Sequence, residues 1–241
     1  MGKKRVWGTT ESQLESMARL LLIHVEGPTE ENFVNEVLRV HLMAKGNLYV
    51  AARILGSGRQ RGGIGNWPDV RREIRHHLLE DTGCVATTMI DYYGMPQKWP
   101  GRAAAKAQGT VEQKARSVEK ALKKDLITAM GLRGFNPNRF VPFVVMHEFE
   151  GLLFSDCAAF SRGIEQPQLA VHFRKVREKF ATPEDINDSP NSAPSKRIEA
   201  LVHGYQKRQH GLLAAQEIGL PRIREECPHF DGWMKRLEAL I

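Results

Sequence analysis

Acidic side chains follow three separate apolar runs of the sequence, each at the point where the run ends. These acids are Glu26, Asp91, Glu148 and Glu150. Several carboxylates that meet within a few ångströms repel one another unless a cation lies between them. Oxygen ligands of this hard type select magnesium or manganese rather than zinc. The pattern therefore predicts a site for Mg²⁺ or Mn²⁺, provided that the fold brings the three run ends together.

Each of the three runs has the length and composition of a buried β-strand bounded by turn residues. They span residues 20–25, 84–90 and 140–146, and residues 48–55 form another run of this kind. Helical spacing of apolar residues occurs between them, in segments 29–42, 67–80 and 103–130. Strands that alternate with helices predict an α/β fold with a mainly parallel sheet and helices on both faces. The carboxyl ends of parallel strands lie at one edge of the sheet, so this fold would gather the acids.

The local positions of the acids refine this hypothesis. Glu30 lies four residues after Glu26, one turn into a helix that Thr29 is expected to cap, and could face the same ion. In an extended strand, Glu148 and Glu150 would share one face of the backbone. Taken singly, each acid also fits an ordinary turn former or helix cap. Their repetition at three strand ends favours the metal site.

The composition indicates a chain that buries a core and carries excess positive charge. Of its 241 residues, 41% are hydrophobic, and 35 Lys and Arg against 28 Asp and Glu give a net charge of +7. The three cysteines lie far apart in the sequence, which argues against a disulfide scaffold or a cysteine-rich zinc site. No apolar run reaches the ~18 residues of a spanning helix, and the N-terminus has no signal-peptide pattern. We therefore expect a cytoplasmic protein without a membrane partner.

Basic and aromatic residues in the loops are candidates for contacts with nucleic acid. Positive side chains could hold phosphates, and tyrosines after the Asp91 strand could stack on unpaired bases. The candidates are Arg59, Arg61, Tyr92, Tyr93, Lys98 and Arg197. For the two tyrosines, ordinary packing within the loop is an equally good interpretation. For Arg197, a solvated position at a helix start is the favoured interpretation.

Two levels of resemblance to a known family support the metal hypothesis. The run VEGPTEE at residues 25–31 resembles the first motif of the Toprim domain. This is the metal-dependent fold of topoisomerases, primases, recombination proteins and overcoming-lysogenization-defect (OLD) nucleases. A wider ordered set, which includes VEGPTEENFVNEVL, TTMIDYYGMP, HEFEGLLFSD and APSKRI, resembles a bacterial family of uncharacterised Toprim-like proteins. The set runs from about residue 20 to residue 240, so it covers nearly the whole chain.

The resemblance implies roles for the first acids of the chain. Glu26 would be the acid of the first motif, and Glu30 would match a second acid seen in OLD-type nucleases. Asp91 would match the first Asp of the D-x-D motif, but Tyr93 stands where the second Asp is expected. This departure leaves open whether the site holds one metal ion or two.

Later residues would complete the site that the resemblance implies. Glu148 or Glu150 would supply the missing carboxylate, and Lys196 would supply the cation that such nucleases place near the scissile phosphate. We expect Glu26, Asp91 and Glu148 to bind the metal directly. The expected function is a Mg²⁺- or Mn²⁺-dependent nuclease that hydrolyses DNA or RNA. The resemblance further implies a role in bacterial phage defence with a separate ATPase partner.

Two other function classes stay open. One is a nucleic-acid- or partner-binding module with a degenerate Toprim site, which the missing second Asp favours. The other is phosphoryl or nucleotidyl transfer to a small substrate, which fits the acids but leaves the basic residues unused. The glycine-rich segment 56–66 lacks the G-K-[ST] ending of a Walker A loop, so it does not predict an ATP site of that type.

The expected domain organisation has three parts. Residues 1–19 form a polar lead-in, residues 20–155 form the Toprim-like α/β core, and residues 156–241 form a helical C-terminal extension packed on the core. The pattern implies no particular oligomeric state.

Overall fold

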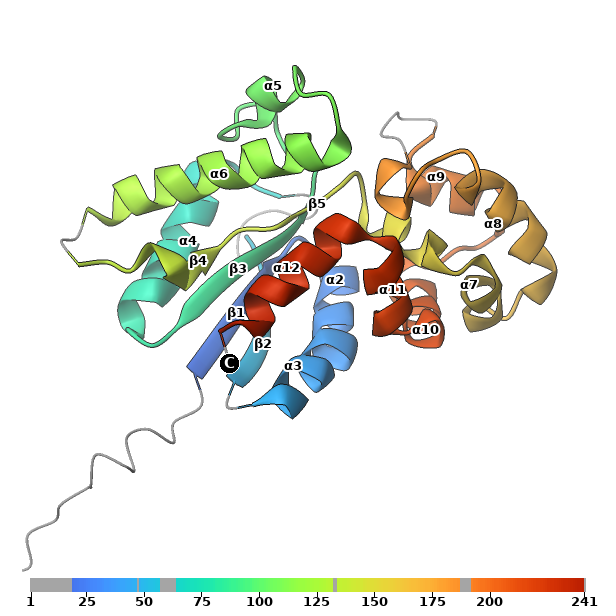
Figure 1. The fold of residues 1–241 in the computed structure, drawn as a ribbon, viewed down its shortest axis with the longest axis horizontal. Coiled ribbons are helices and arrows are strands. Elements are labelled where there is room, and N and C mark those ends of the chain that lie inside the picture. The colour runs from blue at the N-terminus through green and yellow to red at the C-terminus, as the bar shows by residue number, and fades with distance from the viewer. Residues whose placement is uncertain (1–18, 47, 57–63, 132–133, 187–191, 241) are drawn as a thin grey trace, which may run out of the picture.

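A parallel β-sheet forms the centre of the computed structural model, which describes residues 19–46, 48–56, 64–131, 134–186 and 192–240 (Figure 1). The strands run in the order β2-β1-β3-β4, and β5 also pairs with β3. Their bounds are β1 (Arg19–Val25), β2 (Leu48–Ile54), β3 (Val85–Asp91), β4 (Phe140–Val141) and β5 (Val144–Val145). All four pairings are parallel. The predicted α/β fold with a mainly parallel sheet is confirmed, whereas nearly all of the expected lead-in lies outside the described residues.

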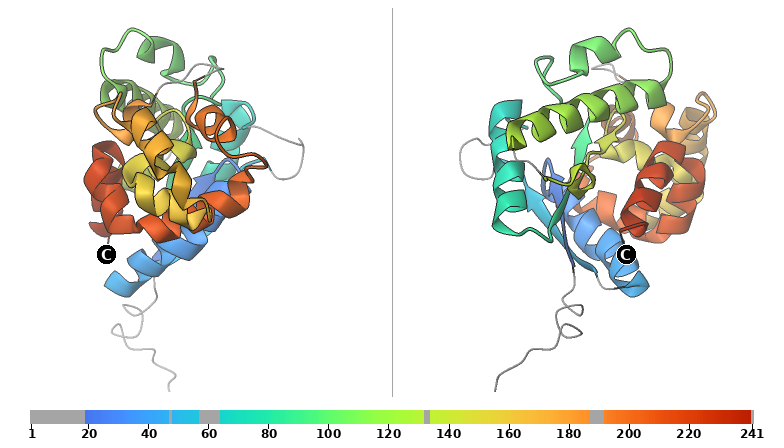
Figure 2. Two further views of the ribbon diagram at one scale, coloured as in Figure 1. Left: turned by 90° about the vertical axis from the view of Figure 1, so that its right-hand side faces the viewer. Right: turned by 60° about the vertical axis from the view of Figure 1, so that its left-hand side comes forward.

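Helices cover both faces of the sheet (Figures 1 and 2). One face carries α4 (Trp67–Glu80), α5 (Arg102–Ala105) and α6 (Val111–Met130). The other face carries α2 (Pro28–Phe33), the π-helical turn η1 (Val34–Leu38), α3 (Arg39–Lys45) and α12 (Pro228–Glu238). Alternate residues of β3 pack into the two cores, Ala86 with α4 and α6, and Val85 with α2 and α12. Both layers therefore depend on the same buried strand.

The remaining helices gather beyond the carboxyl ends of the strands (Figure 1). They are α7 (Cys157–Gly163), α8 (Ala170–Arg177), α9 (Pro194–Glu199), α10 (Lys207–Ile218) and α11 (Leu220–Glu226). Short 3₁₀ turns connect them and the strands: η2 (Pro137–Arg139), η3 (Phe149–Ser155), η4 (Pro167–Leu169) and η5 (Pro183–Asp185). Within the described ranges, no helix has the length and apolarity that crossing a bilayer requires.

The strand order creates a switch point between β1 and β3. From β1 the chain crosses to β2 on one side, and the later strands β4 and β5 lie on the far side of β3. In open α/β sheets, ligands bind in the crevice outside the carboxyl ends at such a point. The residues that follow β1 and β3 therefore occupy the favoured position for a site.

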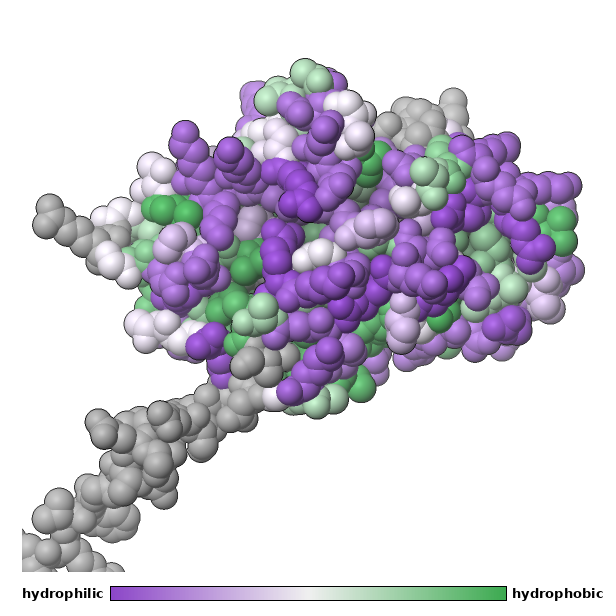
Figure 3. All heavy atoms as spheres, in the orientation of Figure 1, coloured by the Kyte–Doolittle hydropathy of each residue, from purple (hydrophilic) through white to green (hydrophobic). Residues whose placement is uncertain are grey.

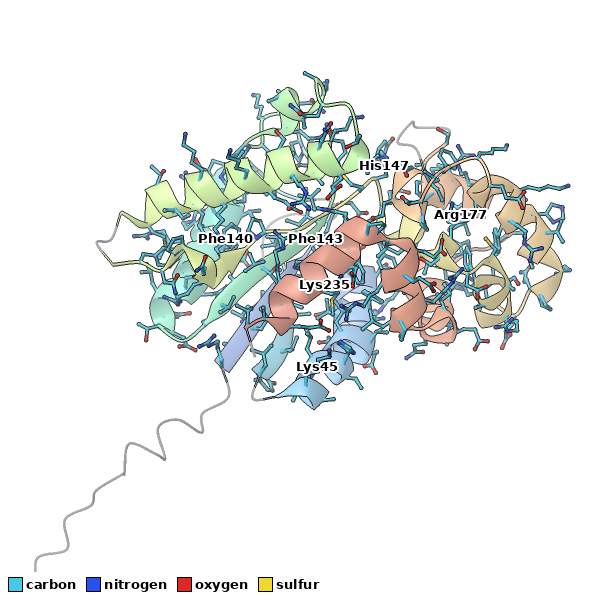
Figure 4. All side chains as sticks on the ribbon, in the orientation of Figure 1. Lys45, Phe140, Phe143, His147, Arg177 and Lys235 are labelled. Carbon is cyan, nitrogen blue, oxygen red and sulfur yellow. The ribbon has the colours of Figure 1, made fainter. Side chains whose placement is uncertain are left out.

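The single strand expected over residues 140–146 is interrupted between β4 and β5. Pro142 has no N–H with which to continue the ladder. The Thr88 hydroxyl takes over the backbone groups of Phe143: it donates to the Phe143 carbonyl at 2.8 Å and accepts from the Phe143 amide at 3.0 Å. Phe140 then packs in the core under α6 and Phe143 in the core under α12 (Figure 4). The break thus moves one aromatic ring into each layer.

Two helix boundaries also differ from the expectation. Gly27, rather than Thr29, is the N-cap of α2, because Pro28 takes the first helical position. The long helix expected over residues 103–130 is two helices, α5 and α6. Thr110 starts α6 with a capping box in which its hydroxyl accepts from the Gln113 amide and the Gln113 side chain accepts from the Thr110 amide, both at 3.1 Å.

The C-terminal helix α12 belongs to the core of the sheet. Trp233 is fully buried, stacks on Phe143 with ring centroids 4.3 Å apart, and donates its indole N–H to Thr87 Oγ1 at 2.9 Å. Glu184 accepts the amides of His229 and Phe230 at the start of the helix, at 2.9 and 3.0 Å. The last segment of the chain therefore completes one face of the first strands.

Replacing Trp233 with a small residue should destabilise the whole protein, because the substitution would leave a cavity under the sheet. We expect Trp233→Ala to lower the free energy of unfolding by about 3–5 kcal/mol, measured by urea denaturation. Lys235→Ala, two residues away on the same helix with an exposed side chain, should change it by less than about 0.5 kcal/mol. An equal decrease in the free energy of unfolding of the two variants would contradict a core shared by α12 and the sheet.

Candidate functional site

The carboxyl ends of β1, β3 and β5 lie side by side. Val25, the last residue of β1, pairs with Met89 of β3, and Asp91 at the end of β3 pairs with Val145 of β5. The acids that follow these strands are consequently neighbours. The negative charges of four other acids raise the pKa of Asp91. In decreasing order of effect, these acids are Glu30, Glu26, Glu150 and Glu148. We call the five residues Glu26, Glu30, Asp91, Glu148 and Glu150 the acidic cluster.

Glu26 projects from the turn after β1 toward the loop that follows β3. Its Oε2 atom is buried and accepts no hydrogen bond from the described residues. A Cβ atom at Gly94 would lie 3.1 Å from Glu26 Oε1, so a larger residue there would require the carboxylate to shift by a few tenths of an ångström. Glu26 therefore offers an oxygen without a partner to whatever occupies the site.

Backbone amides hold three other members of the acidic cluster. Gly27 donates to Glu30 Oε2 at 3.1 Å, Phe149 donates to Asp91 Oδ1 at 3.0 Å, and Ser195 donates to Glu148 Oε2 at 2.8 Å. The last of these bonds joins the start of α9 to the sheet. Amide donors stabilise ionised carboxylates and fix their orientation. The fold therefore positions these acids through bonds that do not neutralise their charge.

The segment HEFE does not continue the strand as expected. Glu148 has an extended backbone but begins the 3₁₀ turn η3, in which Phe149 and Glu150 lie. His147, just before it, adopts a left-handed φ of 66°, and its carbonyl accepts from the Tyr93 amide at 2.9 Å. Both glutamates are nonetheless buried, with exposed fractions of 8% and 3%. The expected shared strand face is wrong, but the turn brings both carboxylates to the site.

Lys207, at the start of α10, supplies positive charge that the sequence did not indicate. Its Nζ atom lies 3.2 Å from Glu150 Oε1. Burial alone would lower the pKa of Lys207, but the charges of Glu150 and Glu148 outweigh it and raise this pKa. The lysine therefore stays protonated beside the acidic cluster. No motif distinguishes it in the sequence, because Lys207 lies 57 residues after Glu150 in a polar segment typical of an exposed helix.

The acidic cluster holds more negative charge than its surroundings compensate. Burial and then the charges of its neighbours raise the pKa of Asp91 well above its usual value. Burial also raises the pKa of Glu26 and of Glu150, although Lys207 acts against both shifts. Burial, with smaller contributions from Glu150 and Glu26, raises the pKa of Glu30 to about 7. Positive charge, added either as protons or as a metal ion, would reduce the repulsion between these carboxylates.

The donor set fits a hard divalent cation. Every member contributes carboxylate oxygens, which Mg²⁺ and Mn²⁺ prefer, and Glu26 Oε2 is buried without a partner. Within the described residues, however, no group of three His, Cys, Asp or Glu side chains already stands in a metal-binding arrangement. Carboxylates without a cation turn apart because they repel. Binding would accordingly require some of these side chains to turn toward a common point.

Lys196 and Arg197, the expected phosphate-binding cations, make contacts with residues outside the acidic cluster. Lys196 is exposed and pairs with Glu199 of its own helix at 2.6 Å. Arg197 donates to the Ser192 carbonyl at 2.7 Å, and its guanidinium lies over the Phe180 ring. The segment APSKRI still reaches the site, but through the Ser195 amide rather than through its basic side chains. Of the two lysines, it is Lys207 whose Nζ atom contacts a member of the acidic cluster.

Among the residues expected to contact nucleic acid, the structure buries one and exposes two others. Tyr92 is buried, with 2% of its surface exposed, and the Arg102 guanidinium lies 3.7 Å from the centre of its ring. The expected stacking of bases on Tyr92 is therefore wrong, because the interior occupies its ring. Tyr93 is 38% exposed and Lys98 is exposed, so both can meet a ligand. Arg59 and Arg61 lie outside the described residues.

The raised pKa of Glu30 should make the chelator-treated protein less stable as the pH rises. A folded-state pKa above the unfolded one contributes stability that is complete below about 4.5 and is lost as the pH passes about 7. Over that range Glu30 should account for roughly 3 kcal/mol of lost unfolding free energy. Glu30→Gln should flatten the pH profile, and Glu36→Gln, at an exposed site, should leave it unchanged. Parallel profiles for wild type and Glu30→Gln would contradict the burial of this charge.

Comparison with known proteins identifies a family but no activity. The model of a family described as "Domain of unknown function (DUF4276)" matches residues 25–238, which include the whole acidic cluster and Lys207. Searches of curated proteins and of solved structures gave no match. Because the match spans nearly the whole chain, this protein belongs to the DUF4276 family.

Proposed function

We propose that this protein is a divalent-metal-dependent nuclease of the Toprim type that hydrolyses phosphodiester bonds in DNA or RNA. The observation that carries the proposal is the gathering of five acidic side chains beside Lys207 at the switch point of a parallel sheet. Three of these acids, Glu30, Glu148 and Glu150, are buried. A structural role alone would not require so much uncompensated charge. Buried like charges with shifted pKa values are typical of functional sites.

The acidic cluster would divide into ligands and assisting groups. Glu26, Asp91 and Glu148, which follow three adjacent strands, would hold Mg²⁺ or Mn²⁺. When bound, such an ion activates water as a nucleophile and stabilises charge on the phosphate. Glu30 and Glu150 would stand beside the reacting water as proton acceptors.

Lys207 would stabilise the negative charge that develops on the phosphate during hydrolysis. It is the cation that contacts Glu150, at 3.2 Å, and it keeps its proton in this environment. A fixed positive group next to developing charge contributes strongly to catalysis in a site that excludes water. The same role was expected of Lys196, whose side chain instead pairs with Glu199.

A nucleic-acid substrate agrees with the residues that surround the site. The chain carries a net charge of +7, which favours a polyanionic partner. Tyr93 and Lys98 are exposed on the loop that follows Asp91. An exposed aromatic ring and an exposed cation on this loop would suit an unpaired base and its phosphate. The cellular setting that we propose is cytoplasmic phage defence with a separate ATPase partner.

Lysine substitutions test the assignment of Lys207. With Mg²⁺ or Mn²⁺, we expect wild type to cleave labelled single-stranded DNA, RNA or plasmid. Lys207→Gln should lower the rate about 100-fold, since it removes one charge-stabilising group. Lys196→Gln should have less than a twofold effect, which we regard as negligible on the scale of one lost interaction. Equal effects of the two substitutions would rule out this role for Lys207.

Metal binding is testable without any nuclease assay. Saturating Mn²⁺ should raise the melting temperature of wild type at pH 8, because a ligand that binds only the folded state stabilises it. Asp91→Asn and Glu26→Gln should abolish most of that shift, and Glu36→Gln should keep it. A shift that persists in both site variants would place the ion elsewhere.

A binding module with a degenerate metal site is the second candidate function. Tyr93 occupies the position of the second Asp of D-x-D, and its backbone amide is bonded to the His147 carbonyl. This class predicts nucleic-acid binding that survives chelation, without cleavage. The assays above therefore separate the two candidates directly.

A further inference from the structure

A cavity of about 600 Å³ lies between α6, β4 and α12, away from the acidic cluster. Figure 3 shows apolar atoms between α6 and α12, flanked by hydrophilic side chains. The lining of the cavity contains Arg116, Lys120, Lys123 and Arg236, with a single acid, Glu119. It shares no residue with the acidic cluster. We call this cavity the basic pocket.

The acid in the basic pocket is already engaged with the interior of the protein. Glu119 is buried, with 5% of its surface exposed. Its Oε1 atom lies 3.0 Å from His229 Nε2 and accepts the Val144 amide at 3.1 Å. Its Oε2 atom lies 3.5 Å from Arg236 Nη2. Glu119 therefore cannot offset the charge of all four cations around it.

Lys123 and Arg236 line the basic pocket together. Burial lowers the pKa of Lys123, and the charge of Arg236 lowers it further. Arg116 pairs with Glu112 at 2.6 Å, but this pair lies on the exposed surface of one helix, where such contacts are weak. An anion in the basic pocket would relieve the repulsion between Lys123 and Arg236. The charge balance thus indicates an acidic ligand.

The other side of the basic pocket is apolar. Val141 and Pro142 come from the strand segment, and Ala239 and Leu240 directly follow the end of α12. A free inorganic anion would leave this surface exposed to water. A ligand with a flat apolar part and an anionic part would satisfy both surfaces at once.

We propose that the basic pocket binds a nucleotide, with its phosphates on Lys123 and Arg236 and its base against Val141, Pro142 and Leu240. The volume lies within the range of small-molecule sites, about 300–1,000 Å³. A strand of nucleic acid would need a path of cations that continues beyond the cavity, whereas these cations converge on one concavity. The inference does not depend on the proposed nuclease activity.

Calorimetric titration of the full chain in chelator, at low ionic strength, tests the proposal. ADP should bind, and it should bind at least about tenfold more tightly than pyrophosphate or adenosine, since each of these retains only one half of the contacts. Lys123→Gln and Arg236→Gln should each weaken ADP binding about tenfold, which is the loss expected for one charge-assisted hydrogen bond.

Lys124→Gln is the matched control, because Lys124 is the next residue of α6 and is exposed. It should change the affinity for ADP by less than about twofold. Glu26→Gln, in the other site, should leave ADP binding intact even if the nuclease proposal fails. Three results would overturn the nucleotide proposal: no ADP binding up to about 5 mM, equal binding of pyrophosphate and ADP, or an oligonucleotide that binds through Lys123 and Arg236 while ADP does not.

Discussion

Repulsion between carboxylates that have been removed from water is the constraint around which this end of the molecule is organised. The charges of four other acids raise the pKa of Asp91, and burial raises the pKa of Asp91, Glu26, Glu30 and Glu150. The surrounding chain responds with directed donors: the amides of Gly27, Phe149 and Ser195 each bond one carboxylate oxygen. These donors orient the acids but add no net charge, so a large imbalance is retained. A protein that needed only stability would replace such groups with apolar ones at little loss.

The C-terminal helices are part of this site rather than an addition to a finished core. Ser195 at the start of α9 holds Glu148, and Lys207 at the start of α10 pairs with Glu150. Trp233 of α12 is bonded to Thr87 in the middle of β3. The hydrophobic core and the acidic cluster both draw residues from the two sides of residue 155, where we expected the C-terminal extension to begin.

The sequence predicted the features that depend on local pattern. Apolar runs of strand length define β1, β2 and β3, and the rule that parallel strands end at one edge predicted that Glu26, Asp91 and Glu148 would be neighbours. Features that depend on distant partners were not predictable. Tyr92 looks like any loop tyrosine until Arg102 covers it, and Lys207 resembles a surface lysine until α10 packs against η3. Pro142 was visible in the sequence, but its effect depends on the hydroxyl of Thr88.

The distribution of charge also bears on how a phosphate could approach. The net charge of +7 would suggest attraction everywhere, but each ionised carboxylate of the acidic cluster beyond the one that Lys207 offsets repels an approaching anion. At short range this repulsion outweighs a diffuse surface charge that salt screens over about 8–10 Å. Under the proposed function, a phosphodiester could therefore enter only after the carboxylate charge has been offset. The metal would then be required for binding of the scissile phosphate as well as for its hydrolysis, and the order of binding would follow from electrostatics alone.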